Sequence, residues 1–213
     1  MTDNEDEIKN RILTTARDQF FSHGFSKVTV DEIAAKMGMS KKTIYKYYPS
    51  KDDLVSAVTT KTLSEVELCC KQIVENPKLD FVDKLRQMMT HAALHIAKMG
   101  KPLIEDLEKN APHVWKQISD FRSKRILEDF GKILRDGVRK GIFRKDIDQR
   151  LMLMIYNNII QNVISPEVLT QIPFTASHVY ETIIKIYFEG IMTDNAKTKF
   201  LPRTKIIIKK KRK

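Results

Sequence analysis

Apolar residues recur every three or four positions along most of the chain, and no other feature constrains its fold as strongly. Ile12, Ala16 and Phe20 show this spacing near the N-terminus, and residues 81–96 repeat it. An α-helix with 3.6 residues per turn brings such residues to one face, whereas a half-buried strand needs strict alternation, which this sequence sustains nowhere. The spacing therefore predicts an all-α protein.

Glycine and proline are scarce, with seven of each, and nearly all of them stand where the apolar pattern pauses. Both residues commonly mark the ends of helices. Their positions predict about nine helices and no internal repeat. The expected helices cover residues 5–23, 29–37, 41–47, 51–74, 81–99, a short segment after residue 102, and residues 112–140, 148–164 and 176–191.

The composition excludes several classes of protein. A chain that is 42% hydrophobic and 31% charged is not disordered as a whole. The longest strictly apolar stretch, Leu151–Tyr156, is far shorter than the roughly 20 residues of a membrane-spanning helix. The acidic N-terminus lacks the features of a secretory signal, so we expect a cytoplasmic protein. Adjacent Cys69 and Cys70 suit that reducing compartment; we expect them to pack as small apolar side chains, with a redox pair as the alternative.

Residues 29–48 have the spacing of a helix-turn-helix motif. Thr29 and Glu32 form a capping box that begins one helix, Gly38 suits the turn, and Ser40 caps the next helix. The side chains expected to point outward from that second helix are Lys41, Lys42, Thr43, Tyr45 and Lys46. Lysine donates to guanine, threonine contacts the thymine methyl group and tyrosine hydrogen-bonds phosphate, so the set suits a DNA major groove. A helical hairpin with a solvated basic face is the alternative.

Residues 8–55 resemble the DNA-binding domain of the tetracycline-repressor (TetR) family of transcriptional regulators. The resemblance is carried by Ile12–Phe21, Gly24, Phe25, Thr29, Ile33, Ala34, Gly38–Ser40, Thr43–Tyr45, Tyr48 and Ser50–Leu54. It covers about a quarter of the chain, and the remainder matches only in its helical plan and length. The resemblance implies a DNA-binding domain at residues 1–55 and a helical ligand-binding and dimerisation domain at 56–195. Residues 196–213 form a basic tail beyond the family's last helix.

The family's DNA contacts can be carried over by position. The resemblance implies that the recognition helix and its start present Ser40, Lys41, Lys42, Thr43, Tyr45, Lys46 and Tyr47. It also implies that Thr29 and Lys51 contact phosphates. Two positions depart from the family: Lys42 stands where many members have glycine, and Tyr47 where histidine is frequent. Base preferences therefore cannot be borrowed from relatives.

The expected helices 148–164 and 176–191 are apolar on nearly every side, so each side needs cover. Either both helices lie inside one monomer, or one face meets a second subunit. The resemblance implies that this pair forms a homodimer, which in turn predicts a palindromic operator. The expected interface residues are Ile155, Ile159, Val163, Ile183, Tyr187 and Ile191.

The resemblance also implies a small-molecule effector that binds in the second domain and releases DNA, as a repressor would require. The candidate residues are Met88, His91, Ala92, His95, Met99, Trp115, Ile118 and Phe121, whose mixture suits a mostly hydrophobic ligand. The alternative is that these side chains simply form core. His91 and His95 are spaced to share a metal ion, but no third ligand is nearby, so we predict neither a metal site nor a cofactor.

No phosphate-binding loop or nucleophile motif stands out, so we do not expect an enzyme. The competing function is a general nucleic-acid binder, because the net charge is +11. Residues 197–213, however, hold nine of the 38 Lys and Arg residues and no acid, which leaves 29 basic against 27 acidic residues elsewhere. We expect this tail either to add non-specific DNA affinity or to be merely solvated. Specific recognition must then depend on the local cluster Lys41, Lys42, Lys46 and Lys51.

Overall fold

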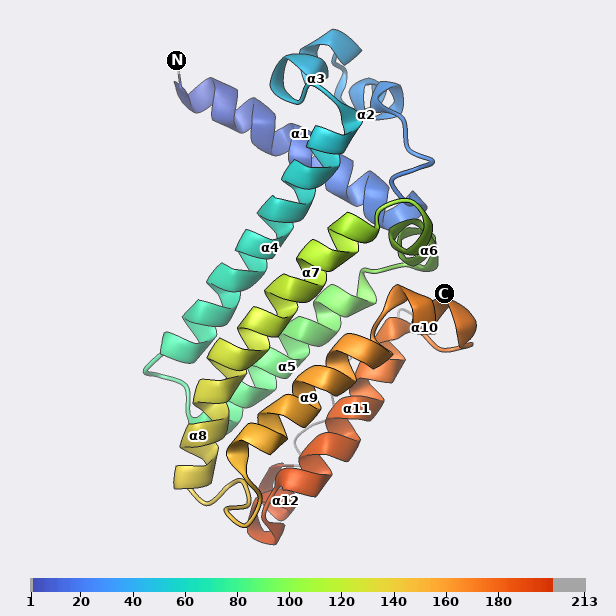
Figure 1. Ribbon diagram of the computed structural model, residues 1–213. Helices are drawn as coiled ribbons and strands as arrows, with labels where there is room; N and C mark the ends of the chain where they lie inside the picture. Colours follow the sequence, from blue (N-terminus) through green and yellow to red (C-terminus); the bar gives the residue numbers. More distant parts are fainter. Residues whose placement is uncertain (1, 201–213) are drawn as a thin grey trace, which may run out of the picture. The chain divides into compact units, whose positions relative to one another are not determined.

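The computed structural model describes residues 2–200, with side chains from Glu5 to Thr198, and this part of the chain is helical (Figure 1). It contains no strand beyond an isolated bridge between Phe143 and Met192. The helices are α1 (Thr2–His23), α2 (Val30–Met37), α3 (Lys41–Tyr47), α4 (Lys51–Glu75), α5 (Phe81–Ala97), α6 (Lys101–Lys109), α7 (Pro112–Arg125), α8 (Gly131–Arg139), α9 (Gln149–Val163), α10 (Pro166–Gln171), α11 (Ala176–Ile191) and α12 (Asp194–Phe200). The all-α prediction is confirmed. No helix within the described residues is long and apolar enough to cross a membrane.

Each of the nine expected helices is present, and two short helices are added. The expected helix 112–140 is continuous but contains a π-helical turn, Ile126–Phe130, between α7 and α8. The added α10 has only six residues, with Ser165 as its cap, and is too short to show an apolar period. The added α12 takes up the start of the segment expected to be a basic tail. The rest of that prediction, residues 201–213, lies outside the described residues.

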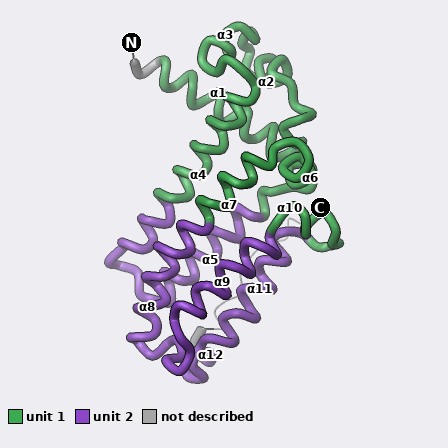
Figure 2. The backbone as a smooth tube through the Cα atoms, in the orientation of Figure 1, with its two compact units in different colours: residues 1–68, 97–122, 165–174 green, residues 69–96, 123–164, 175–213 purple. Residues whose placement is uncertain are grey.

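The chain divides into two compact units (Figure 2). Unit 1 comprises residues 1–68, 97–122 and 165–174, and unit 2 comprises residues 69–96, 123–164 and 175–213. The expected DNA-binding domain, residues 1–55, lies within unit 1. That unit also takes in α6, most of α7 and α10.

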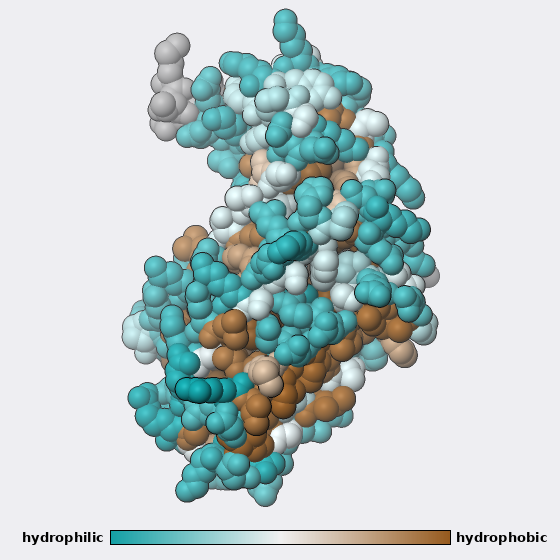
Figure 3. Space-filling model, viewed as in Figure 1, coloured by the Kyte–Doolittle hydropathy of each residue, from teal (hydrophilic) through white to brown (hydrophobic). Residues whose placement is uncertain are grey.

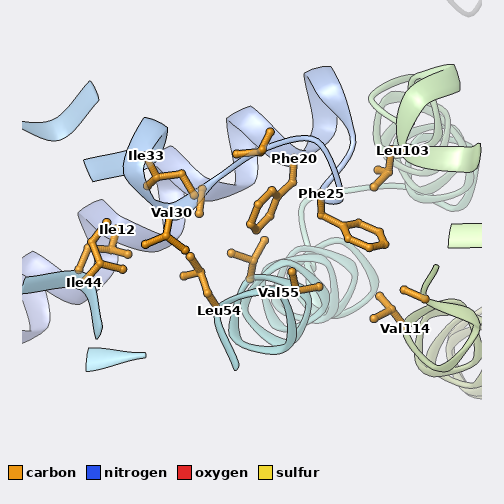
Figure 4. Close-up of a cluster of buried hydrophobic side chains, with 14 of the residues drawn as sticks. Ile12, Phe20, Phe25, Val30, Ile33, Ile44, Leu54, Val55, Leu103 and Val114 are labelled. Atoms are coloured by element: carbon orange, nitrogen blue, oxygen red, sulfur yellow. The ribbon is translucent and has the colours of Figure 1, made fainter. Parts of the chain in front are cut away.

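One hydrophobic core explains why unit 1 extends beyond residue 55. Its members come from α1 to α4 and from residues 103–114: Ile12, Ala16, Phe20, Phe25, Val28, Val30, Ile33, Ala34, Ile44, Leu54, Val55, Val58, Leu103, Leu107, Ala111 and Val114. Phe25, between α1 and α2, points toward Leu103 and Val114 (Figure 4). The segment that leads into the helix-turn-helix motif is therefore packed directly on α6 and α7.

Unit 2 is organised around aromatic side chains. The ring of Phe130, from the π-helical turn, lies 4.6 Å from Tyr156 of α9 and 6.0 Å from Phe188 of α11. The Tyr187 hydroxyl donates a hydrogen bond to the Met152 carbonyl at 2.6 Å. Burial raises the pKa of Tyr187, which keeps this phenol protonated as a donor.

Candidate nucleic-acid interface

The first helix of the motif begins at a complete capping box. The Thr29 hydroxyl accepts a hydrogen bond from the Glu32 amide at 3.2 Å, and the Glu32 carboxylate accepts from the Thr29 amide at 2.7 Å. The Thr29 hydroxyl also donates to that carboxylate at 3.0 Å. These bonds from Thr29 lower the pKa of Glu32, because they favour its ionised form. The sequence prediction of this box is confirmed.

The turn between α2 and α3 depends on Gly38. Its φ is 65° and its ψ is 30°, in the left-handed region that glycine enters without strain. The amide of Gly38 bonds to the Ala35 carbonyl at 3.1 Å, and that of Met39 bonds to Ala34 at 2.9 Å. The last carbonyls of α2 are thereby satisfied and the chain reverses.

Ser40 and Ile44 orient α3. The Ser40 hydroxyl accepts from the Thr43 amide at 3.1 Å and lies 2.9 Å from the Thr43 hydroxyl, so the helix start is capped. Ile44 is fully buried and fixes which face of α3 meets the core. As a result Lys41, Lys42, Tyr45 and Lys46 are exposed, on an end of unit 1 whose surface is largely hydrophilic (Figure 3).

Two of the three lysines of α3 have acidic partners. The Lys41 ammonium lies 2.8 Å from an Asp31 carboxylate oxygen, and the hydrogen bond raises the pKa of Lys41. The Lys46 ammonium lies 3.6 Å from Glu5 of α1. Within the described residues, Lys42 has no ion-pair partner. Lys42 is therefore the α3 cation most available to a new anionic partner.

The remaining predicted contacts differ in exposure. Thr29 and Ser40 are exposed, but Thr43 is half-buried under its bond to Ser40. Tyr47 is half-buried against the unit 1 core, as is the neighbouring Tyr48, whose pKa is raised by burial.

Lys51 is also half-buried, and its ammonium donates to the Ser26 carbonyl at 3.2 Å. The sequence showed none of these partners, because folding brings Glu5 and Ser26 to the motif and packs α2 and α3 so that Asp31 meets Lys41.

The predicted ligand residues fall in both units. Met88, His91, Ala92 and His95 lie on α5 in unit 2, where the two imidazole rings are 4.5 Å apart. Met99, Trp115, Ile118 and Phe121 lie in unit 1. Met88 is buried and the other seven are half-buried. Their role in ligand binding stays a prediction.

Two surface hollows are lined by other side chains. One, of about 660 Å³, lies between α1 and α2, and its lining is Asp6, Glu7, Asn10, Arg11, Thr14, Thr15, Lys36 and Met37. The second, of about 460 Å³, lies beside α8 and α9, and its lining is Gly131, Leu134, Arg135, Lys145, Ile147, Asp148, Gln149, Arg150 and Leu153. Neither hollow contains a residue predicted to bind the ligand.

Half of the residues predicted for the dimer interface are buried within the protomer. Ile183, Tyr187 and Ile191 are at most 8% exposed, because this face of α11 forms the core of unit 2. Ile159 and Val163 are half-buried, while Ile155 is 47% exposed.

The apolar side chains exposed on α9 and α11, two helices that pack against each other, include only Ile155 of the predicted set. Leu151, Met154 and Ile155 of α9 and Ile186 of α11 are 47–67% exposed. A band of apolar surface follows these two helices (Figure 3). Leu151, Met154 and Ile155 stand at positions i, i+3 and i+4, and this spacing in the sequence would have identified the exposed face of α9.

An all-α chain that presents two capped helices around a glycine turn, with exposed lysines on the second, belongs to the class of helix-turn-helix DNA-binding proteins. Comparison with known proteins gives the family. Residues 12–58 match the family described as "Bacterial regulatory proteins, tetR family". The chain is 30% identical over 189 residues to YvaF of Bacillus subtilis, an uncharacterised HTH-type transcriptional regulator, covering 88% of this chain and 97% of that protein. The protein belongs to the TetR family and is a DNA-binding transcriptional regulator.

Solved structures share the fold. A transcriptional regulator from Saccharomonospora viridis in complex with choline aligns with a TM-score of 0.64 at 19% identity, covering 88% of this chain and 99% of that one. FadR of Bacillus subtilis in complex with stearoyl-CoA aligns with a TM-score of 0.57 at 19% identity, covering 85% and 98%. At this identity the likeness concerns the helical architecture alone.

Proposed function

We propose that this regulator binds a palindromic operator as a homodimer, inserts α3 into the major groove and represses transcription until a small hydrophobic effector releases it. The observation that carries the proposal is the arrangement of α3, in which buried Ile44 leaves Lys41, Lys42, Tyr45 and Lys46 exposed. Since the family acts in transcription, we place the protein in the cytoplasm.

Within this proposal, the residues of α3 divide by role. Lys42, without an intramolecular ion pair among the described residues, reads a base edge, with guanine O6 and N7 as its natural acceptors. Lys41, Lys46 and Tyr45 contact phosphates beside the groove. Contacts to phosphate set the register of the helix on the duplex, and base contacts set the sequence preference.

The exposed apolar face of α9 and α11 supports the homodimer. A second copy is the occupant that the family leads us to expect, and a two-fold dimer presents two α3 helices to two half-sites. Sedimentation equilibrium should show a dimer for the native protein and a monomer for Ile186→Glu. Leu94→Glu, an exposed leucine on α5 that is 51% accessible, is the matched control and should stay dimeric. A monomeric native protein would refute this part.

The proposed effector is a small hydrophobic molecule. The S. viridis and B. subtilis regulators are described as complexes with choline and stearoyl-CoA, so ligand binding accompanies this fold. The apolar character of Met88, Met99, Trp115, Ile118 and Phe121 favours a hydrophobic molecule here.

Selection of genomic fragments by the purified protein tests the operator. We expect enrichment of one palindromic sequence, and its neighbouring genes would suggest the class of effector. Enrichment of random fragments, without a shared sequence, would instead favour a general nucleic-acid binder.

A further inference from the structure

A buried carboxylate on α6 holds the segment that leads into the helix-turn-helix motif. Asp106 is only 8% exposed. One of its carboxylate oxygens accepts a hydrogen bond from the Ser26 amide at 2.8 Å, and the other accepts from the Asn110 side chain at 2.9 Å. Ser26 lies between α1 and α2, 80 residues away in sequence, so this contact ties α6 to the approach to α2.

The turn between α1 and α2 lies too close to α6 to leave room for any side chain at residue 24. Gly24 has a φ of +80°, and a Cβ atom there would lie 2.4 Å from an Asp106 carboxylate oxygen and 2.9 Å from the Pro102 carbonyl. Glycine is required both by the backbone conformation and by the space. The turn between α1 and α2 therefore packs closely against α6.

Ser26 also contacts Lys51, the cation that faces DNA in the proposed complex. The Ser26 carbonyl accepts a hydrogen bond from the Lys51 ammonium at 3.2 Å. Burial raises the pKa of Asp106, but the Ser26 and Asn110 hydrogen bonds and the Lys51 charge outweigh it, so the net pKa is lowered. Asp106 is thus an anion that fixes the amide of Ser26, while the carbonyl of Ser26 fixes Lys51.

We infer that Asp106 is a positioning residue for DNA binding, which acts through Ser26 to place the Lys51 ammonium against a DNA phosphate. The inference rests on the proposed function. A lysine ammonium has three donors, so one bond to Ser26 leaves two for phosphate oxygens. Since α6 packs on α1 and α10 within unit 1, the placement of Lys51 depends on the seating of α6.

The test measures affinity and its salt dependence for an operator fragment, using the native protein, Asp106→Asn, Lys51→Gln and the double variant. Lys51→Gln should reduce the salt slope by about one, as expected for the loss of one phosphate contact. Asp106→Asn should weaken binding about three- to tenfold and reduce the slope toward that of Lys51→Gln. The double variant should bind like Lys51→Gln, because Asp106 acts through that lysine.

Glu105→Gln, at the half-buried acid next to Asp106 on α6, is the matched control and should leave both quantities unchanged. Two outcomes would show that Asp106 only supports the fold and would overturn the inference. In the first, Asp106→Asn lowers the affinity but leaves the salt slope unchanged. In the second, Asp106→Asn lowers the affinity of the Lys51→Gln protein as much as it lowers that of the native protein. If Asp106→Asn does not fold, an unchanged salt slope for Lys51→Gln alone overturns it. Failure of the native protein to prefer any operator would contradict the proposed function itself, which is a distinct outcome.

Discussion

The ammonium of Lys41 lies 2.8 Å from the carboxylate of Asp31, which joins the first turn of α3 to the first turn of α2. Both side chains are substantially exposed, so the pair contributes little to stability. A phosphate that approaches Lys41 must compete with Asp31 for the same donors. The pair therefore limits how much Lys41 adds to DNA binding.

Asp31→Asn should strengthen DNA binding by about two- to fivefold, because the substitution removes this competitor without removing the lysine. Fluorescence anisotropy with an operator fragment measures the change. Asp52→Asn, an exposed acid in the first turn of α4, is the control and should have a smaller effect. Equal gains for both variants would mean that general electrostatics, and not the ion pair, is responsible.

Gly38→Ala should destabilise the protein by about 1 to 2 kcal/mol, the cost of a left-handed backbone for a residue with a Cβ atom. Gly190→Ala in α11 should instead stabilise it by about 0.5 to 1 kcal/mol, because alanine favours the helix. Neither added Cβ would meet an atom within 4 Å, so the two sites differ in backbone conformation alone. Thermal unfolding checks the pair, and a shift of the same sign in both would contradict the turn geometry.

Tyr187→Phe should reduce stability by about 0.5 to 1.5 kcal/mol through loss of the buried hydrogen bond to the Met152 carbonyl. The ring and its contact with Tyr156, 5.0 Å away, are retained. Tyr45→Phe removes a hydroxyl from a 37% exposed side chain and should leave stability unchanged. Denaturant unfolding of both variants measures the difference, and equal stabilities would show that the buried bond contributes nothing.

Asp106 should make stability depend on pH in the acid range. Its pKa in the folded state is below the ordinary aspartate value of 3.8, so its contribution is complete above that value and is lost as the pH falls through it toward the folded pKa. Asp106→Asn should therefore be less stable than the native protein near neutral pH, with a difference that shrinks below pH 3.8. Unfolding curves across this range provide the measurement, with Glu105→Gln as control. A difference independent of pH would contradict the lowered pKa.

Local signals account for most of what could be predicted. Thr29, Gly38 and Ser40 define helix ends through bonds to residues only a few positions away, so short-range chemistry was enough to place α2 and α3. The π-helical turn in residues 126–130 was not predicted, because an apolar pattern does not distinguish it from α-helix.

Contacts between distant residues were not predictable in this way. Apolar period alone cannot say which face of α11 the protomer covers. The expected interface therefore includes Ile183, which is buried in the protomer, and omits Ile186, which is exposed. The contact between Asp106 and Ser26 joins residues 80 positions apart in the sequence. Its only local sign in the sequence is Gly24, which by itself indicates no more than a helix end.

In the proposed function, α3 distinguishes one DNA sequence from others of the same composition. The most direct test is the ratio of dissociation constants for a fragment enriched from the genome and for a shuffled fragment of the same composition, at physiological salt. We predict a ratio of ~10³ or more for the native protein, and a ratio lower by roughly tenfold for Lys42→Ala. Equal dissociation constants for the two fragments would contradict the claim.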